Sequence, residues 1–91
     1  MIDVRTERTG ADWRCTVRVV DGQSATEHTV NVSAGDLERL DPGASDPTEL
    51  VRRSFEFLLE REPKESILRS FDLPVIGRYF PEYERSIRPR L

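Results

Sequence analysis

The first 33 residues alternate apolar and polar side chains with a period of two, the pattern of strands that bury one face. Two glycine turns, Gly10-Ala11 and Asp21-Gly22, divide this stretch into three runs. The alternation therefore predicts strands at about residues 2–8, 12–20 and 24–33. The apolar side of these strands carries Ile2, Val4, Trp13, Cys15, Val17, Val19, His28, Val30 and Val32.

The two turns also predict how the strands pair. A two-residue loop at the first turn places Val4 opposite Val17. A two-residue loop at Asp21-Gly22, a favoured type I′ pair, places Cys15 opposite His28. Both registers gather the apolar side chains on one face, so we expect an antiparallel β-meander covered on that face. Its opposite, polar face pairs Asp3 with Arg18 and Glu7 with Arg14.

The residues after the strands favour helices. Ser33 precedes a short helix expected at about 34–40. Asp46 can cap a longer one at about 47–61, with Pro47 in the first helical position. The apolar stripe of this main helix contains Leu50, Val51, Ser54, Phe55 and Leu58.

Three prolines in the last third predict the starts of further short helices. Pro63, Pro74 and Pro81 each suit a first helical position, which gives helices near 63–70, 74–80 and 81–87. The apolar contacts of these helices should come from Ile67, Leu68, Phe71, Leu73, Val75, Ile76, Tyr79, Phe80 and Tyr83. The whole chain, residues 1–91, is thus expected to be a single α+β domain: a three-stranded meander without a clear fourth strand, covered by helices on one face.

Composition and charge narrow the function classes. A net charge of −3 argues against a protein whose whole surface attracts nucleic acid. One cysteine excludes an internal disulfide and any multi-cysteine metal site. The sequence has no apolar run approaching the length of a membrane span, and we expect a cytoplasmic protein without membrane contact.

Few residues are candidates for chemistry. Cys15 and His28 could form a thiol nucleophile or part of a soft metal site, but both are expected on the core side, where packing is the simpler role. Glu56 and Glu60 share a helix face, where neighbouring basic residues favour solvated ion pairs over acid–base catalysis. We therefore predict no catalytic residue, no metal site, no cofactor and no small-molecule ligand.

The C-terminal end is locally basic. Residues 66–91 carry five arginines against three acids, with aromatic residues between them. Such a patch can neutralise phosphates while its rings stack on bases. A nucleic-acid site would use Arg78, Arg85, Arg88 and Arg90, although the rings are expected to serve the core instead.

The run from Phe57 to Tyr83, FLLEREPKESILRSFDLPVIGRYFPEY, resembles the C-terminal part of a family of short, uncharacterised prokaryotic proteins of actinobacterial type. The resemblance covers residues 50–87 and implies a bacterial or archaeal cytoplasmic protein, with no activity and no site residues. Three strands followed by helices are also similar in topology to antitoxin domains of the HicB type.

The sequence as a whole favours a non-enzymatic protein-interaction or regulatory domain. A partner, either another protein or a second copy in a homodimer, would use leftover apolar surface or the unpaired edges of the first and third strands. The alternative is a nucleic-acid-binding or antitoxin-like regulator that uses the C-terminal arginines.

Overall fold

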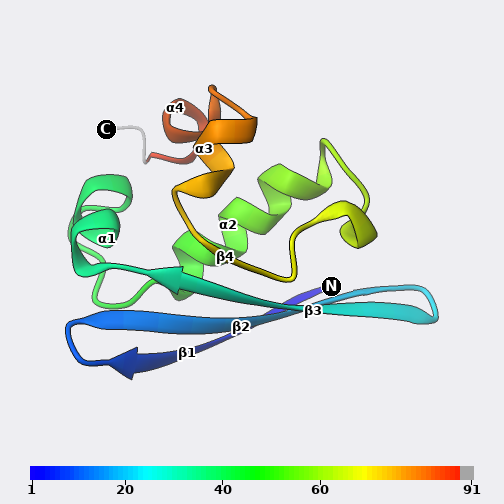
Figure 1. Ribbon diagram of the computed structural model, residues 1–91, viewed down its shortest axis with the longest axis horizontal. Helices are drawn as coiled ribbons and strands as arrows, with labels where there is room; N and C mark the ends of the chain where they lie inside the picture. The colour runs from blue at the N-terminus through cyan, green and yellow to red at the C-terminus, as the bar shows by residue number, and fades with distance from the viewer. Residues whose placement is uncertain (89–91) are drawn as a thin grey trace.

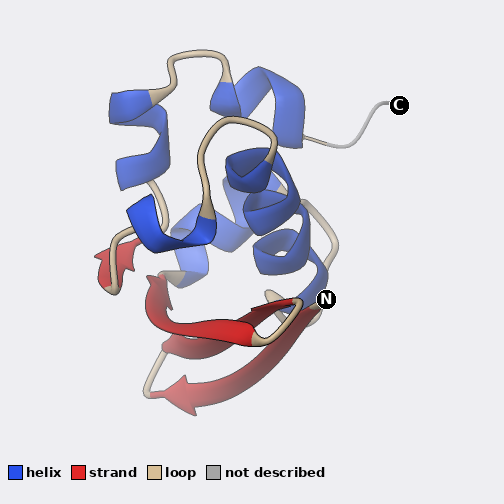
Figure 2. Cartoon of the chain, turned by 90° about the vertical axis from the view of Figure 1, so that its right-hand side faces the viewer, coloured by secondary structure: helices blue, strands red, loops and turns tan. Residues whose placement is uncertain are grey.

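A four-stranded sheet with helices on one face forms the molecule, as the computed structural model shows for residues 1–88 (Figure 1). Seen from the side, the sheet is one layer and the helices are the other (Figure 2). The first three strands form the predicted antiparallel meander, and the last strand adds in parallel to the third. The strands are β1 (Ile2–Thr9), β2 (Asp12–Asp21), β3 (Ser24–Val32) and β4 (Ser70–Asp72).

The pairing of β1 with β2 confirms the predicted register. Val4 lies opposite Val17, and on the polar face Arg14 lies 3.9 Å from Glu7. The intervening loop is Gly10-Ala11, with Gly10 at φ +68°, a backbone conformation that favours glycine. The alternation of this sequence and its first turn therefore specify the same hairpin.

The predicted pairing of β2 with β3 is wrong by two residues. Val17, not Cys15, lies opposite His28, because Asp21 is still paired and the loop is Gly22-Gln23. Only Gly22 then has a positive φ, +62°, as in a type II′ turn, whereas a type I′ turn would also force Asp21 into that region. A shift of two residues keeps every side chain on its predicted face.

The helix predicted at 34–40 is confirmed, and the one predicted at 47–61 is confirmed with shorter ends. Helix α1 (Ala34–Leu40) begins where the Asp36 amide donates to the Ser33 hydroxyl at 3.0 Å. Helix α2 (Thr48–Leu59) begins one residue later than expected, so Pro47, not Asp46, is the N-cap residue. Asp46 still accepts a hydrogen bond at Oδ1 from the Thr48 amide at 2.9 Å. Its buried stripe contains Leu50, Val51, Ser54, Phe55, Phe57 and Leu58.

The predicted helix at 63–70 is wrong. Only a 3₁₀ helix, η1 (Lys64–Ser66), forms there, and the chain then extends into the unpredicted strand β4. The Thr29 amide of β3 donates to the Arg69 carbonyl at 2.8 Å, and the Leu73 amide donates back to the Asn31 carbonyl at 2.9 Å. The expectation of no fourth strand therefore fails, because β3 supplies the backbone partners that make this short segment a strand.

The last two helices form close to the expected positions. Helix α3 (Val75–Tyr79) follows Pro74, and helix α4 (Tyr83–Ile87) begins two residues after Pro81. Two aromatic contacts join α2 to this region. Phe57 lies 5.3 Å from Tyr83 and 5.9 Å from Phe80 between ring centroids, in edge-to-face geometry.

A buried polar contact fastens α4 to α2. The Ser54 hydroxyl donates to the Leu50 carbonyl at 2.7 Å, and the Tyr83 hydroxyl lies 2.7 Å from the same Ser54 oxygen. Ser54 and Tyr83 are both fully buried. Because the hydrogen of Ser54 is already donated, the Tyr83 hydroxyl is the donor of the second bond.

Candidate functional site

Cys15 and His28, the two residues with potential for nucleophilic chemistry, both serve the core. Cys15 on β2 and His28 on β3 are both buried. Burial, helped by the charge of Asp46, raises the pKa of the Cys15 thiol to about 11, so the reactive thiolate is scarce at neutral pH. Both ring nitrogens of His28 have partners at 2.8 Å, the Leu68 carbonyl at Nδ1 and the Thr26 hydroxyl at Nε2. Neither side chain is free to act on a substrate.

Of the glutamates in the 56–65 region, Glu60 and Glu65 form ion pairs, whereas the exposed Glu56 forms none within residues 1–88. Glu60 lies 3.3 Å from Arg61, as expected of a solvated helix face, and Glu65 lies 2.7 Å from Lys64. The hydrogen bond from Lys64 holds the pKa of Glu65 below its ordinary value. Glu62 differs, because it is half-buried and, within residues 1–88, its carboxylate has no ion-pair partner.

The arginines predicted to contact nucleic acid lie on two different helices and beyond the second one. Arg78, on α3, lines a polar hollow together with three aspartates, Asp12, Asp36 and Asp72. Arg85 is exposed on α4 and Arg88 follows it, whereas Arg90 lies outside the described residues. Tyr83 is fully buried, so its ring cannot stack on a base.

An apolar groove opens on the surface of residues 1–88. It lies between the end of α2, the η1 segment, β4 and α3, and its volume is about 160 Å³. An apolar cavity of about 150 Å³ holds a benzene molecule, so the groove has room for one aromatic or leucine-sized side chain. Its lining residues are Leu58, Glu62, Ser66, Ile67, Leu68, Phe71, Val75, Ile76, Tyr79 and Phe80.

Two large apolar side chains at the groove are exposed to solvent. Leu68 is 47% exposed and Tyr79 is 67% exposed, so the expectation that both serve the core is wrong. They are brought together by β4, which holds the chain between η1 and α3 against the sheet. The hydrogen bond from His28 to the Leu68 carbonyl fixes the backbone beneath one of them. The buried His28 therefore holds the backbone of the exposed Leu68 in place.

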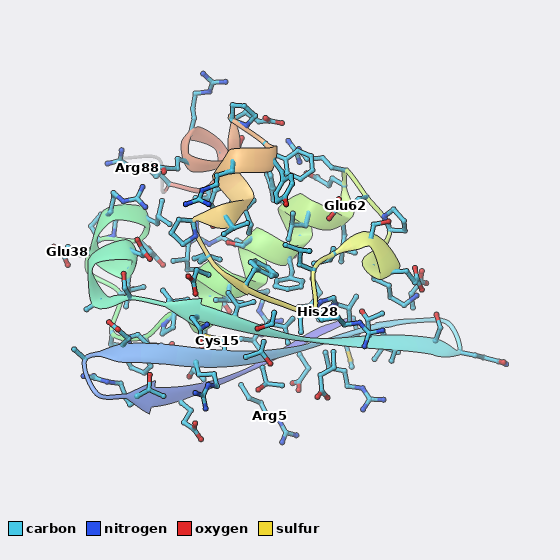
Figure 3. All side chains as sticks on the ribbon, in the orientation of Figure 1. Arg5, Cys15, His28, Glu38, Glu62 and Arg88 are labelled. Carbon is cyan, nitrogen blue, oxygen red and sulfur yellow. The ribbon has the colours of Figure 1, made fainter. Side chains whose placement is uncertain are left out.

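Glu62 supplies the charged group of the groove. It lies just beyond the end of α2, on the helix side of the molecule (Figure 3). Lys64, two residues after Glu62, already forms an ion pair with Glu65. Arg61, on the other side of Glu62, forms ion pairs with Glu60 and Glu82. A carboxylate beside an apolar groove, whose basic neighbours in the sequence are already paired, can receive a cation from outside the chain.

The sequence reasoning missed this groove. Its walls were recognised as apolar residues, but their assembly depends on β4, which three residues without clear alternation could not reveal. One signal of exposed apolar surface was available in the sequence. Ile67, Leu68 and Phe71 are spaced so closely that one short helix could not bury all three.

Among residues 1–88, no three His, Cys, Asp or Glu side chains lie close enough together to hold a metal ion. Within the same part of the chain, every helix is too short or too polar to cross a membrane. Comparison of the chain with protein-family models, curated proteins and solved structures found no match.

Proposed function

We propose that this protein is a non-enzymatic protein-interaction domain, and that its groove binds a short apolar segment of another protein. The observation that carries the proposal is the exposure of Leu68 and Tyr79 at the same apolar groove. Exposed apolar residues that gather at a concave site mark interaction surfaces more often than scattered ones do. The packing of Cys15 and His28 into the core supports a role without catalysis.

The groove favours a partner of particular chemistry. Its floor, which includes the buried side chains of Ile67, Phe71 and Ile76, suits one inserted apolar side chain. Glu62 adds a carboxylate without an ion-pair partner in residues 1–88. We therefore expect the bound segment to present a large apolar residue and, close to it in sequence, a lysine or arginine.

A displayed library of random peptides tests this function. Selection on the intact protein should enrich sequences with one large apolar residue near a basic residue. Binding of the enriched peptide should be lost in Leu68→Ser and Tyr79→Ser and weakened by about three- to tenfold in Glu62→Gln, because hydrogen bonds to charged groups contribute roughly 1.5–3 kcal/mol before solvent exposure reduces them.

Arg85→Gln is the matched control, since Arg85 is exposed on α4 and does not line the groove. Equal binding to all four variants would contradict the groove assignment. Salt-sensitive binding of RNA or DNA that is lost when Arg85 and Arg88 become Ala would favour the nucleic-acid alternative instead.

A further inference from the structure

The outer edge of β1 has free backbone groups whose identity follows from the hairpin. Met1 and Val20 exchange two hydrogen bonds, each 2.9 Å long. Hydrogen-bonded pairs alternate along an antiparallel ladder, so the odd-numbered residues of β1 point their backbone groups toward β2. The amides and carbonyls of Ile2, Val4, Thr6 and Arg8 therefore point away from the sheet.

One of these outward groups is already bound. Arg52 of α2 donates from Nη1 to the Ile2 carbonyl at 2.9 Å. In residues 1–88, no such bond reaches the outward backbone groups of Val4, Thr6 or Arg8. The opposite side of the meander is partly closed, because β4 pairs with β3. The part of β1 after Ile2 is thus an open strand edge of the described chain, and such edges pair readily with another strand.

The charges of β1 suit a second copy in one register. Antiparallel pairing of two copies about a two-fold axis must join even-numbered residues, since only those have free backbone groups. With Thr6 opposite Thr6 of the second copy, Arg5 lies opposite Glu7 of the second copy, and by symmetry this ion pair forms twice. Between the two copies, Arg5 and Glu7 form non-hydrogen-bonded pairs, in which opposing side chains approach most closely.

The alternative registers are less favourable. If Thr6 lies opposite Arg8 of the second copy, Glu7 faces Glu7 and the charges repel. If Val4 lies opposite Thr6 of the second copy, Arg5 faces Arg5 and Asp3 faces Glu7, so all the paired charges repel. If Val4 lies opposite Val4, the charges attract, but the strand needs the Ile2 carbonyl that Arg52 already binds. The register centred on Thr6 alone combines attracting charges with free backbone groups.

We propose that the protein self-associates through β1 into a two-fold dimer, with Thr6 at the axis and Arg5 paired with Glu7 of the second copy. The two sheets then form one continuous sheet with all helices on the same side. The side chain of Arg5 is 85% exposed and lies 3.6 Å from Asp3, so it can turn to the second copy without leaving a buried partner. It points away from the helix layer (Figure 3). The dimer leaves the groove free and does not depend on the function proposed for it.

Charge reversal tests the register. In Arg5→Glu the introduced carboxylate faces Glu7 of the second copy twice, and in Glu7→Arg the introduced guanidinium faces Arg5 twice. Each single variant should therefore raise the dimer dissociation constant by about tenfold or more. An equimolar mixture of the two variants restores both attracting pairs and should form a heterodimer at least as stable as the wild-type dimer. Sedimentation velocity over a range of protein concentrations, with one variant fluorescently labelled, measures all three species.

Arg69→Glu and Glu38→Arg are matched controls, because both residues are exposed and lie outside β1, and they should leave self-association unchanged. Circular dichroism of each variant checks that it is folded. A wild-type protein that is monomeric at every concentration would overturn the proposal, since the charges would then only protect the edge from pairing. A dimer that resists both reversals, or variants that fail to form the heterodimer, would overturn it as well.

Discussion

The buried hydroxyl pair between α2 and α4 leads to a prediction about the sign of a mutational effect. Tyr83 donates to Ser54, and Ser54 donates to the Leu50 carbonyl, each across 2.7 Å. The two side chains are therefore not equivalent. Ser54 keeps a partner for its hydrogen when Tyr83 is changed, whereas Tyr83 loses its acceptor when Ser54 is changed.

The magnitudes follow from this asymmetry. Tyr83→Phe removes one neutral hydrogen bond, which should lower the free energy of unfolding by about 1 kcal/mol. Ser54→Ala leaves a buried hydroxyl without a partner, at a cost of about 1–3 kcal/mol, offset by roughly 0.5 kcal/mol of better helix propensity. The double variant has no stranded hydroxyl. Tyr83→Phe should therefore destabilise the wild type but stabilise the Ser54→Ala variant by about 1 kcal/mol.

Urea denaturation of the four proteins measures these differences, provided that their m-values agree. In thermal unfolding each kcal/mol should correspond to a shift of about 4–8 °C for a domain of this size. The decisive measurement is the sign of the stability change that Tyr83→Phe causes in the Ser54→Ala background. If Tyr83→Phe destabilises both backgrounds by similar amounts, the hydroxyl has another partner in the native state, and the assigned direction of the hydrogen bonds is refuted.

Two further predictions concern the buried Cys15 and His28. Because the pKa of Cys15 is raised from 9.0 to about 11 in the folded protein, its contribution to stability is complete below pH 9 and is lost as the pH rises to 11. As the pH rises above 9, the free energy of unfolding measured with urea should fall by about 3 kcal/mol less in Cys15→Ala than in the wild type. An equal fall in both proteins would disprove the prediction. His28→Leu should lower stability by about 1–3 kcal/mol because the Leu68 carbonyl loses its donor. The same change should weaken peptide binding at the groove in isothermal titration, whereas retained affinity would show that Leu68 does not need this anchor.

Tertiary contacts decided most of the candidate site. The sequence identified Ile67, Phe71 and Ile76 as apolar, and all three are buried, but it could not separate them from the exposed Leu68 and Tyr79. A local pattern reports that a residue is apolar, not whether its neighbours can cover it. Here the covering depends on β4, whose partner strand lies about forty residues earlier in the chain.

The sequence by itself determined the elements whose information is local. Period-two alternation set the faces of β1, β2 and β3, and the capping residue Ser33 set the start of α1, because these signals act between residues a few positions apart. Only the tertiary structure decided the slide of β3 by two residues and the conversion of residues 70–72 into a strand, which closes part of the β3 edge that was expected to be unpaired. A slide of two preserves the alternation, and a parallel strand needs a distant backbone partner, so neither leaves a mark in the local pattern.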